Sequence, residues 1–284
     1  MSFKRPTCPT CTKPARVCLC SQIRIPRIDN KTRVTILQHQ LEGKHPLNSA
    51  KIATLGFRNV IVHTVSDVTS KVELSIQSPE TTLKELGSDG IATATIGKYG
   101  EIISLTSDWI PPNRNPKQSI FGEISSSAGA RETLAKGFVV VKRENAGSET
   151  WREEFRIGVP SGSVVLFPSE RAVGAEEMNA KKMEIGNLIV VDGTWAKAKR
   201  VFKENPWLEL LPHLKLNIGR ESMYGEVRSQ PKEGCLSTIE SIVFALKAIG
   251  DHCEGLDELL GIFESMVCNQ RRCKYERLKA ENSQ

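Results

Sequence analysis

The stretch NLIVVDGTW, residues 187–195, decides the fold that we expect for this chain. Its first half is an apolar, β-branched run of about five residues, which is typical of a strand covered on both faces. The run leads into Asp192 and Gly193 and then into a helical pattern, WAKAKRVFKE (195–204), which stops before Asn205 and Pro206. A buried strand followed at once by a helix is the building unit of α/β folds.

Similar apolar runs extend this unit into a sheet. They predict strands at 33–38, 58–65, 138–142 and 163–168. Helical patterns follow at 48–56, 237–249 and 256–278, with Asn48 as the expected N-cap of the first. Ser237 and Glu240 fit the capping box of a helix start. We therefore predict the α/β class with a mostly parallel sheet.

The segment from about 66 to 136 differs from the rest. It is rich in Ser, Thr, Gly and Pro, includes PPNRNP (111–116) and SSSAGA (125–130), and lacks a strong hydrophobic period. A short strand fits IISL (102–105). We interpret the segment as a low-complexity insertion or flexible excursion from the core.

Composition excludes several classes of protein. The chain has 284 residues, of which 39% are hydrophobic and 25% charged, a balance that excludes a mostly disordered chain, collagen and a small disulfide scaffold. No apolar run approaches the roughly 20 residues that cross a bilayer. MSFKRPT (1–7) is too short and polar for a secretory or transit signal. We expect a cytoplasmic or nuclear location, no membrane and no obligatory protein partner.

Four cysteines near the start have the spacing of a metal site. Cys8, Cys11, Cys18 and Cys20 fall in a segment too short to bury a core, and zinc held by four thiolates would stabilise it. We predict a structural zinc knuckle over residues 1–30, because four thiolates leave no open position for water. The alternative is four unliganded or redox-active thiols. The other four cysteines lack ligand-like spacing, so packing is their expected role.

The DGTW turn is the candidate binding site. It follows a buried strand and opens a helix, and in a parallel sheet this edge binds ligands. Gly193 permits close backbone approach, and the N–H groups at the helix start can receive a carboxylate or phosphate. Asp192 could act as a base or bind a cation, and Trp195 could stack on a base or an adenine. The alternative is that Asp192 or Thr194 caps the helix while Trp195 packs in the core.

Basic residues crowd the helix that the turn opens. Lys197, Lys199, Arg200 and Lys203 lie within one short stretch, and contact with RNA phosphates is a reasonable hypothesis. The net charge of +6 permits such binding without proving it. Arg220 and Arg228, which precede the capping box, are further candidates.

Five motifs occur in order along nearly the whole chain: the C-x-x-C…C-x-C cluster, LQHQLEGKHPLNSAKIATLG (37–56), VLFPSERA (165–172), DGTW (192–195) and GCLSTIES (234–241). Together they resemble the DTW-domain family of tRNA-uridine aminocarboxypropyltransferases. The resemblance implies a SPOUT-like fold with a knotted cofactor site, here a DTW catalytic domain over residues 31–284. It also implies transfer of the 3-amino-3-carboxypropyl group of S-adenosylmethionine to N3 of a tRNA uridine, leaving methylthioadenosine.

The resemblance also points to site residues. Asp192 is the candidate catalytic acceptor of the N3 proton, while its charge could instead hold the ligand's ammonium group or fix the loop. The cofactor is expected at strand-end loops, against Phe167, Pro168, Ser169, Gly193, Thr194, Trp195, Leu236, Ser237 and Thr238. The uridine must be unpaired, because a Watson–Crick pair occupies N3. Two alternatives stay open: a methyltransferase that uses the same cofactor on RNA, and a non-catalytic zinc-knuckle RNA-binding protein.

Overall fold

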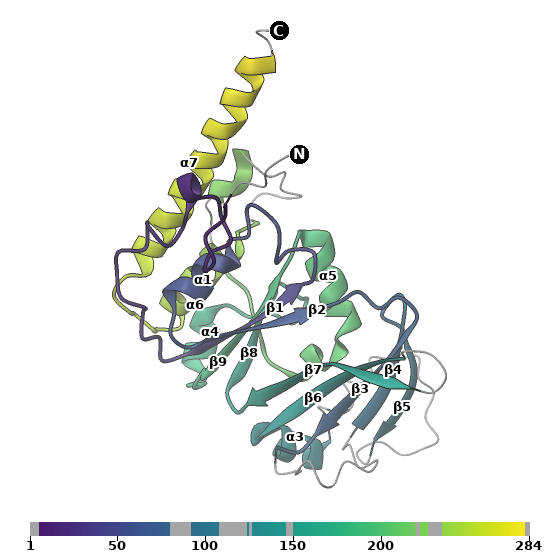
Figure 1. Ribbon diagram of the computed structural model, residues 1–284. Helices are drawn as coiled ribbons and strands as arrows, with labels where there is room; N and C mark the ends of the chain where they lie inside the picture. The colour runs from purple at the N-terminus through teal and green to yellow at the C-terminus, as the bar shows by residue number, and fades with distance from the viewer. Residues whose placement is uncertain are drawn as a thin grey trace.

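The structure is a computed structural model that describes residues 6–79, 92–107, 124, 127–145, 150–217, 219, 222–226 and 235–281. Its described residues form two five-stranded sheets (Figure 1). The first has the strand order β10-β8-β9-β1-β2. Its members are β1 (Arg33–His39), β2 (Val60–Val65), β8 (Ser163–Leu166), β9 (Asn187–Asp192) and β10 (His213–Leu214).

Every pairing in this first sheet is parallel. The strands predicted at 33–38, 58–65, 163–168 and 187–191 are confirmed as its members. Because parallel strands end at the same side, their carboxyl ends form one common edge, here called the carboxyl edge. At this edge Gln38 of β1 lies opposite Asp192 of β9.

The second sheet is antiparallel, with the order β5-β4-β3-β6-β7. The predicted strand at 138–142 lies here and not in the parallel sheet, so that part of the prediction is wrong. An apolar run shows that a strand is buried but not which way its neighbours run. The members are β3 (Lys71–Gln77), β4 (Ala92–Gly97), β5 (Ile102–Ser107), β6 (Gly137–Asn145) and β7 (Trp151–Pro160).

The segment 66–136 is structured wherever the structure describes it. It contributes β3, β4, β5 and the helix α3 (Ala128–Ala135). PPNRNP (111–116) lies outside the described residues, as do the first two residues of SSSAGA (125–130), whose last three residues begin α3. The division into a knuckle over 1–30 and a catalytic domain over 31–284 stays a prediction.

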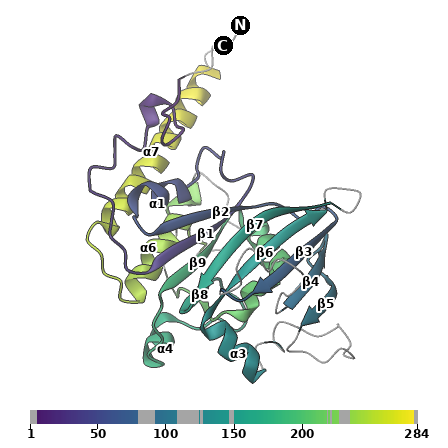
Figure 2. The same cartoon turned by 60° about the horizontal axis from the view of Figure 1, so that its bottom comes forward.

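The helices α1 (Ala50–Gly56), α6 (Thr238–Ala248) and α7 (Leu256–Glu281) cover one face of the parallel sheet, and the second sheet packs toward the other (Figures 1 and 2). Ile36 and Val190 belong to a core shared with α1, α6 and α7. Leu37 and Ile189 face a second core that includes α5 (Trp195–Glu204) and side chains of the antiparallel sheet. Smaller helices are η1 (Ala15–Val17), α4 (Ala175–Ala180), η3 (Pro206–Leu210) and η4 (Met223–Glu226).

The predicted helices are confirmed, and the ends of α5 and the start of α6 have the expected chemistry. The α6 capping box of Ser237 and Glu240 is present, and α5 begins and ends where its sequence pattern does. The N-cap of α1 is Ser49 and not the predicted Asn48, although Asn48 Oδ1 accepts a hydrogen bond from the Lys51 N–H at 3.2 Å. No helix in the described ranges has the length and apolar character that a bilayer crossing requires.

Candidate functional site

A hydrogen-bonded cluster at the carboxyl edge surrounds Asp192. The Asp192 side chain ends β9 and is buried at 5% exposure. Gln38 Nε2 donates to its Oδ2 at 2.8 Å, and the Thr238 hydroxyl donates to its Oδ1. We call these three residues the Asp192 cluster. It joins the ends of β1 and β9 to the first residue of α6, and so unites two predicted site residues, Asp192 and Thr238.

The geometry of this cluster favours one role for the carboxylate over the other. Each oxygen of Asp192 accepts a hydrogen bond from a side chain of another element. A buried carboxylate with two such donors fixes the elements that supply them, because leaving either donor without an acceptor would be costly. The arrangement therefore supports a loop-fixing role more directly than a role as proton acceptor.

The aromatic rings of two predicted site residues stack on each other at the carboxyl edge. The Phe167 and Trp195 rings lie 5.7 Å apart at an interplanar angle of 17°. Phe202 of α5 stacks on Phe167 with a centroid distance of 4.2 Å. Trp195 is half-buried, and the Lys199 ammonium lies 5.5 Å from its ring centroid. The stack thus anchors Trp195 to the core and still leaves part of its ring at the surface.

Ser169 is engaged with a buried histidine. Its hydroxyl lies within hydrogen-bond distance of His213 Nδ1, and His213 Nε2 lies 2.9 Å from the Leu208 carbonyl. Arg171 Nη2 also lies 3.1 Å from His213 Nε2, so this nitrogen faces both a carbonyl acceptor and a guanidinium donor. Burial lowers the pKa of His213, the Leu208 carbonyl opposes this, and the charge of Arg171 lowers the pKa further. Pro168, the neighbouring candidate, is exposed.

Three of the predicted site residues serve the starts of helices. Thr194 Oγ1 caps α5 by accepting the Lys197 N–H at 3.4 Å, as the capping alternative predicted. Ser237 is buried and caps α6, so its hydroxyl is committed to its own helix. A Cβ at Gly193 would lie 3.1 Å from Lys197 Cβ, which explains a residue without a side chain there. Leu236 is half-buried before the cap.

The basic residues of α5 divide into two pairs. Lys197 forms an ion pair with Glu42 at 3.1 Å, and Glu42 is 3% exposed. Arg200 pairs with Asp67 at 3.1 Å and with Glu204 at 2.7 Å. These two cations therefore stabilise the protein itself. Lys199 and Lys203 are exposed, while Arg220 and Arg228 lie outside the described residues.

The acidic partners of α5 were not recognised as site neighbours from the sequence. Asp67 also lies 3.1 Å from His39 Nε2, and His39 is fully buried at the end of β1. His39 Nδ1 accepts the Leu41 N–H at 3.2 Å, so the Nε2 proton points to Asp67. Gln38 was missed in the same way. Only the β1–β9 register, which no local motif reveals, places it against Asp192.

The four N-terminal cysteines form a compact thiol cluster. Their sulfur atoms all lie within 4.8 Å of one another. Cys8 and Cys20 are 3.9 Å apart and Cys11 and Cys18 are 3.6 Å apart, sulfur to sulfur. A regular tetrahedron with a zinc–sulfur distance of about 2.3 Å has sulfur atoms about 3.8 Å apart. The donor set and its spacing therefore fit a four-thiolate metal site.

The backbone around the cluster stabilises thiolates. Burial alone would raise the pKa of Cys11, but N–H groups of Lys13, Leu19 and Cys20 bring that pKa down to about 6. Backbone N–H groups also lower the pKa of Cys8. Burial and the neighbouring thiolates raise the pKa of Cys20 to about 12. Four thiols this close cannot all ionise without a cation among them, as a divalent metal would be.

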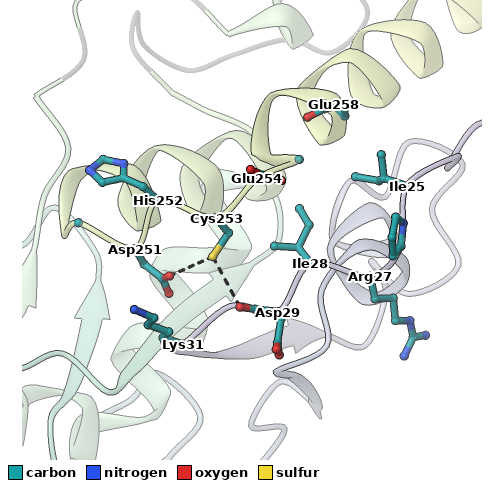
Figure 3. A pocket seen from close by; sticks show the side chains of 13 residues that line it. Ile25, Arg27, Ile28, Asp29, Lys31, Asp251, His252, Cys253, Glu254 and Glu258 are labelled. Carbon is teal, nitrogen blue, oxygen red and sulfur yellow. Dashed lines mark hydrogen bonds between the residues drawn. The ribbon is translucent and has the colours of Figure 1, made fainter.

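A separate cavity of about 700 Å³ lies between residues 25–31 and 250–258 (Figure 3). Within it Cys253 donates to Asp251 at 3.0 Å, and Asp251 accepts the Thr32 N–H at 2.8 Å just before β1. Burial and the Asp251 carboxylate raise the pKa of Cys253 to about 11. The cavity is thus at the amino end of the parallel strands, opposite Asp192, and its thiol is a poor nucleophile.

Comparisons with known proteins agree with this picture. The family profile described as "DTW domain" matches residues 5–271. A protein named tRNA-uridine aminocarboxypropyltransferase 2 from Drosophila melanogaster is 32% identical over 114 residues, which cover 40% of this chain and 42% of that relative. The protein of the same name from Mus musculus is 33% identical over 90 residues, which cover 31% and 30%. The chain therefore aligns with less than half of either relative. No solved structure matches.

Proposed function

The chain belongs to the DTW-domain family, and from that premise we propose that it is a tRNA-uridine aminocarboxypropyltransferase. It transfers the 3-amino-3-carboxypropyl group of S-adenosylmethionine to N3 of a tRNA uridine and releases methylthioadenosine. The names of the relatives support the reaction class. Two observations carry the proposal: the Asp192 cluster and the Phe167–Trp195 stack, both of which lie at the carboxyl edge.

Selecting the right carbon is a task of positioning. The sulfonium activates all three carbons bonded to it, so the protein must bring the aminocarboxypropyl arm in line with N3. The partly exposed ring of Trp195 offers a face on which an adenine stacks. At the start of α6, the Ile239 N–H donates to Ser49 and the Glu240 N–H to Ser237, so the Thr238 N–H is the group proposed to bind the carboxylate of the methionine moiety.

Asp192 acts in this proposal as a positioning residue. By accepting hydrogen bonds from Gln38 and Thr238, it holds the start of α6 at a fixed distance from the ends of β1 and β9. The surfaces proposed to hold the cofactor depend on that distance. A role as base for the N3 proton is the competing assignment, and the substitutions described in the Discussion separate the two.

The cysteine cluster holds a structural zinc ion in this proposal. Cys8, Cys11, Cys18 and Cys20 are its ligands, and the fit of their sulfur spacing is the support. A closed four-thiolate site links the segment covalently and leaves zinc no position for substrate. Such a site suits a reducing compartment, in keeping with the expected cytoplasmic or nuclear location.

The SPOUT-like knot is part of the proposal. Its support is the parallel sheet order β10-β8-β9-β1-β2, together with an α6 that begins at the carboxyl edge. The connection from β10 to α6 includes residues outside the described ranges. A crystal structure that traces residues 215–237 tests it. Passage of that segment through another loop supports the knot, and an unthreaded path contradicts it.

S-adenosylmethionine labelled at one of two positions tests the reaction. The full-length protein is incubated with unmodified tRNA and cofactor labelled either on the methyl group or on the aminocarboxypropyl chain. We expect only the second label to enter tRNA, with methylthioadenosine released in equal amount. Methyl label in tRNA would establish the methyltransferase alternative, and no transfer of either label would leave an RNA-binding protein.

A further inference from the structure

The long C-terminal helix α7 has two unlike halves. From Leu256 to Val267 it packs into the core, and Leu259 and Phe263 are fully buried. From Cys268 onward, no residue whose burial the structure describes is buried. We call residues 268–281 the α7 arm. At 1.5 Å per residue the arm is about 20 Å long, and it projects from the body (Figure 1).

Contacts along α7 show which way the arm points. Near the start of α7, Gly255 lies against Ile28, which precedes β1 in the chain. One helical turn later, Leu259 lies against Gly56, which precedes the start of β2. Further along, the Phe263 ring packs on Tyr224, whose hydroxyl donates to the Leu47 carbonyl in the loop after β1. The helix therefore runs from the amino ends of the strands toward the carboxyl edge. The arm extends past the side of the molecule where Asp192 lies.

The charge of α7 changes with this division. Residues 256–267 hold three acidic and no basic side chains. The arm holds two acidic residues, Glu276 and Glu281, and five basic ones in sequence: Arg271, Arg272, Lys274, Arg277 and Lys279. The helix dipole favours cations in the last turn alone, and only Lys279 lies there. The dipole therefore does not account for basic residues that begin ten positions before the end of the helix.

The arm also presents an aromatic ring among its cations. Tyr275 is 61% exposed, and the Lys279 ammonium lies 4.7 Å from its ring centroid. Exposed aromatic rings within a basic surface are typical of proteins that stack bases and bind phosphates. The apolar stripe that a membrane-surface helix needs is not seen here, where Tyr275 and Leu278 are the exposed large hydrophobic residues of the arm.

The cysteine-cluster segment braces the arm. Arg16 of η1 donates to Cys273 Sγ at 2.9 Å and lies 3.7 Å from Glu276. Lys13 donates to the Pro46 carbonyl, which ties the same segment to the loop after β1. Both views show η1 beside the arm (Figures 1 and 2). A solvent-exposed helix of this length is marginal alone, so this support helps to hold its basic side chains in place.

We propose that the α7 arm binds the phosphate backbone of tRNA, away from the uridine that reacts. That the RNA is tRNA rests on the proposed function. That the arm is the binding surface rests on the arm's charge, its exposure and the direction in which it points. Two of the four α5 cations are committed to internal ion pairs. The exposed cations of the arm therefore supply phosphate contacts that α5 alone does not.

The test compares two full-length triple variants in tRNA binding. The first variant, Arg272→Gln/Lys274→Gln/Lys279→Gln, removes three charges from the arm. The side chains of these three residues are exposed. Lys98→Gln/Arg131→Gln/Lys136→Gln removes three exposed charges from the turn after β4 and from α3 with its C-cap. Each lost phosphate contact lowers the slope of log affinity against log salt by about 0.7–0.9. We expect the arm variant to lose about two units of slope and to bind at least about tenfold more weakly at about 0.1 M salt.

The control variant should keep the wild-type slope, and Arg272→Lys/Lys274→Arg/Lys279→Arg should keep it as well, because charge is conserved. An arm variant with the wild-type slope would overturn the inference. So would an arm variant that loses binding to anionic vesicles but keeps the tRNA slope, since that result marks a membrane surface.

Calorimetry with S-adenosylmethionine and transfer assays on the same samples separate this inference from the proposed function. Transfer by the wild type with no slope change in the arm variant would defeat the arm alone. No cofactor binding and no transfer by the wild type would defeat the proposed function, whatever the slopes show.

Discussion

Asp192 shows what a single residue contributes to this molecule. The DGTW motif points to it, but its two hydrogen-bond partners, Gln38 and Thr238, come from distant parts of the sequence. Residue chemistry alone therefore left two roles open, proton acceptor and anchor. The geometry favours the anchor, because both oxygens accept hydrogen bonds within the protein.

Two substitutions at this position separate the roles. Asp192→Ala leaves two partly buried donors without an acceptor, and we expect it to cost about 1–3 kcal/mol of unfolding free energy. Asp192→Asn keeps an acceptor for Thr238, and the Gln38 amide can turn to accept from the new NH₂ group. We expect it to cost under about 1 kcal/mol and to slow transfer no more than about tenfold. Loss of a general base costs about 10²–10⁴.

Urea unfolding and single-turnover transfer measure both quantities. A stable Asp192→Asn protein whose transfer rate falls by more than about a hundredfold would restore Asp192 as the base. Equal stability of the alanine and asparagine variants would contradict the anchoring role.

His213 gives a residue-scale prediction about pH. Burial lowers its pKa in the folded protein, aided by the Arg171 charge and opposed by the Leu208 carbonyl. Below the ordinary pKa of about 6.5 the unfolded chain takes up this proton before the folded one does. The contribution of His213 to the free energy of unfolding is thus fully present above about pH 6.5. It is lost as the pH decreases toward the lowered pKa, at up to about 1.4 kcal/mol per pH unit.

Unfolding free energies of the wild type and His213→Gln between about pH 5 and 8 test this prediction. The unfolding free energy of the variant should depend on pH less steeply than that of the wild type. Some dependence should remain, because burial also lowers the pKa of His63. Identical pH slopes in the two proteins would rule out the proposed contribution of His213.

At the scale of elements, helix ends were predictable and strand partners were not. The limits of α5 and the capping box of α6 follow from local chemistry, and both are observed. In β3, the buried apolar residues Val72, Leu74 and Ile76 occupy every second position, which is the period of a strand. The Ser- and Thr-rich composition of the surrounding segment obscured this pattern in the sequence. β10 is two residues long and exists through its pairing with β8, so no local pattern could reveal it.

Helix α5 supports a contrast between two lysines. Lys197 neutralises the buried Glu42 carboxylate, so Lys197→Met should cost about 1–3 kcal/mol of unfolding free energy. Lys199 is exposed over Trp195, so Lys199→Met should change stability by no more than about 0.5 kcal/mol. Lys199→Met should instead lower the slope of log tRNA affinity against log salt by about 0.7–0.9, the share of one phosphate contact. Urea unfolding and salt titrations of both variants measure this, and the reverse assignment of effects would contradict it.

The cysteine cluster is an element whose stability depends on metal in this account. We expect about one zinc ion per chain in the wild type, loss of that zinc in Cys8→Ser, and a destabilisation of several kcal/mol. Cys268→Ser is the matched control, because Cys268 is exposed and lies outside the cluster. Elemental analysis and thermal unfolding provide the readouts. Unchanged zinc in Cys8→Ser, or a wild type without metal, would contradict the zinc assignment.

At the scale of the whole molecule, the α/β class and the parallel sheet followed from the sequence, and the second sheet did not. Apolar runs give burial, whereas antiparallel pairing of β6 with β3 and β7 depends on contacts between distant segments. The same limit applies to the site. Motifs named Phe167, Asp192, Trp195 and Thr238, but only the tertiary structure shows that Phe167 meets Trp195 and Asp192 meets Thr238. It also shows that Lys197 and Arg200 form ion pairs within the protein.

The whole-molecule arrangement gives the protein two candidate sites at opposite ends of one sheet. The Asp192 cluster lies at the carboxyl edge, and the cavity of about 700 Å³ around Cys253 lies at the amino end of the strands. We propose that cofactor and uridine bind at the first of these.

A crystal structure of the full chain with bound S-adenosylmethionine tests that placement most directly. The adenine should lie against Trp195, and the methionine carboxylate should lie at the start of α6 beside Thr238. Cofactor density in the cavity between residues 25–31 and 250–258, with the carboxyl edge empty, would contradict the account.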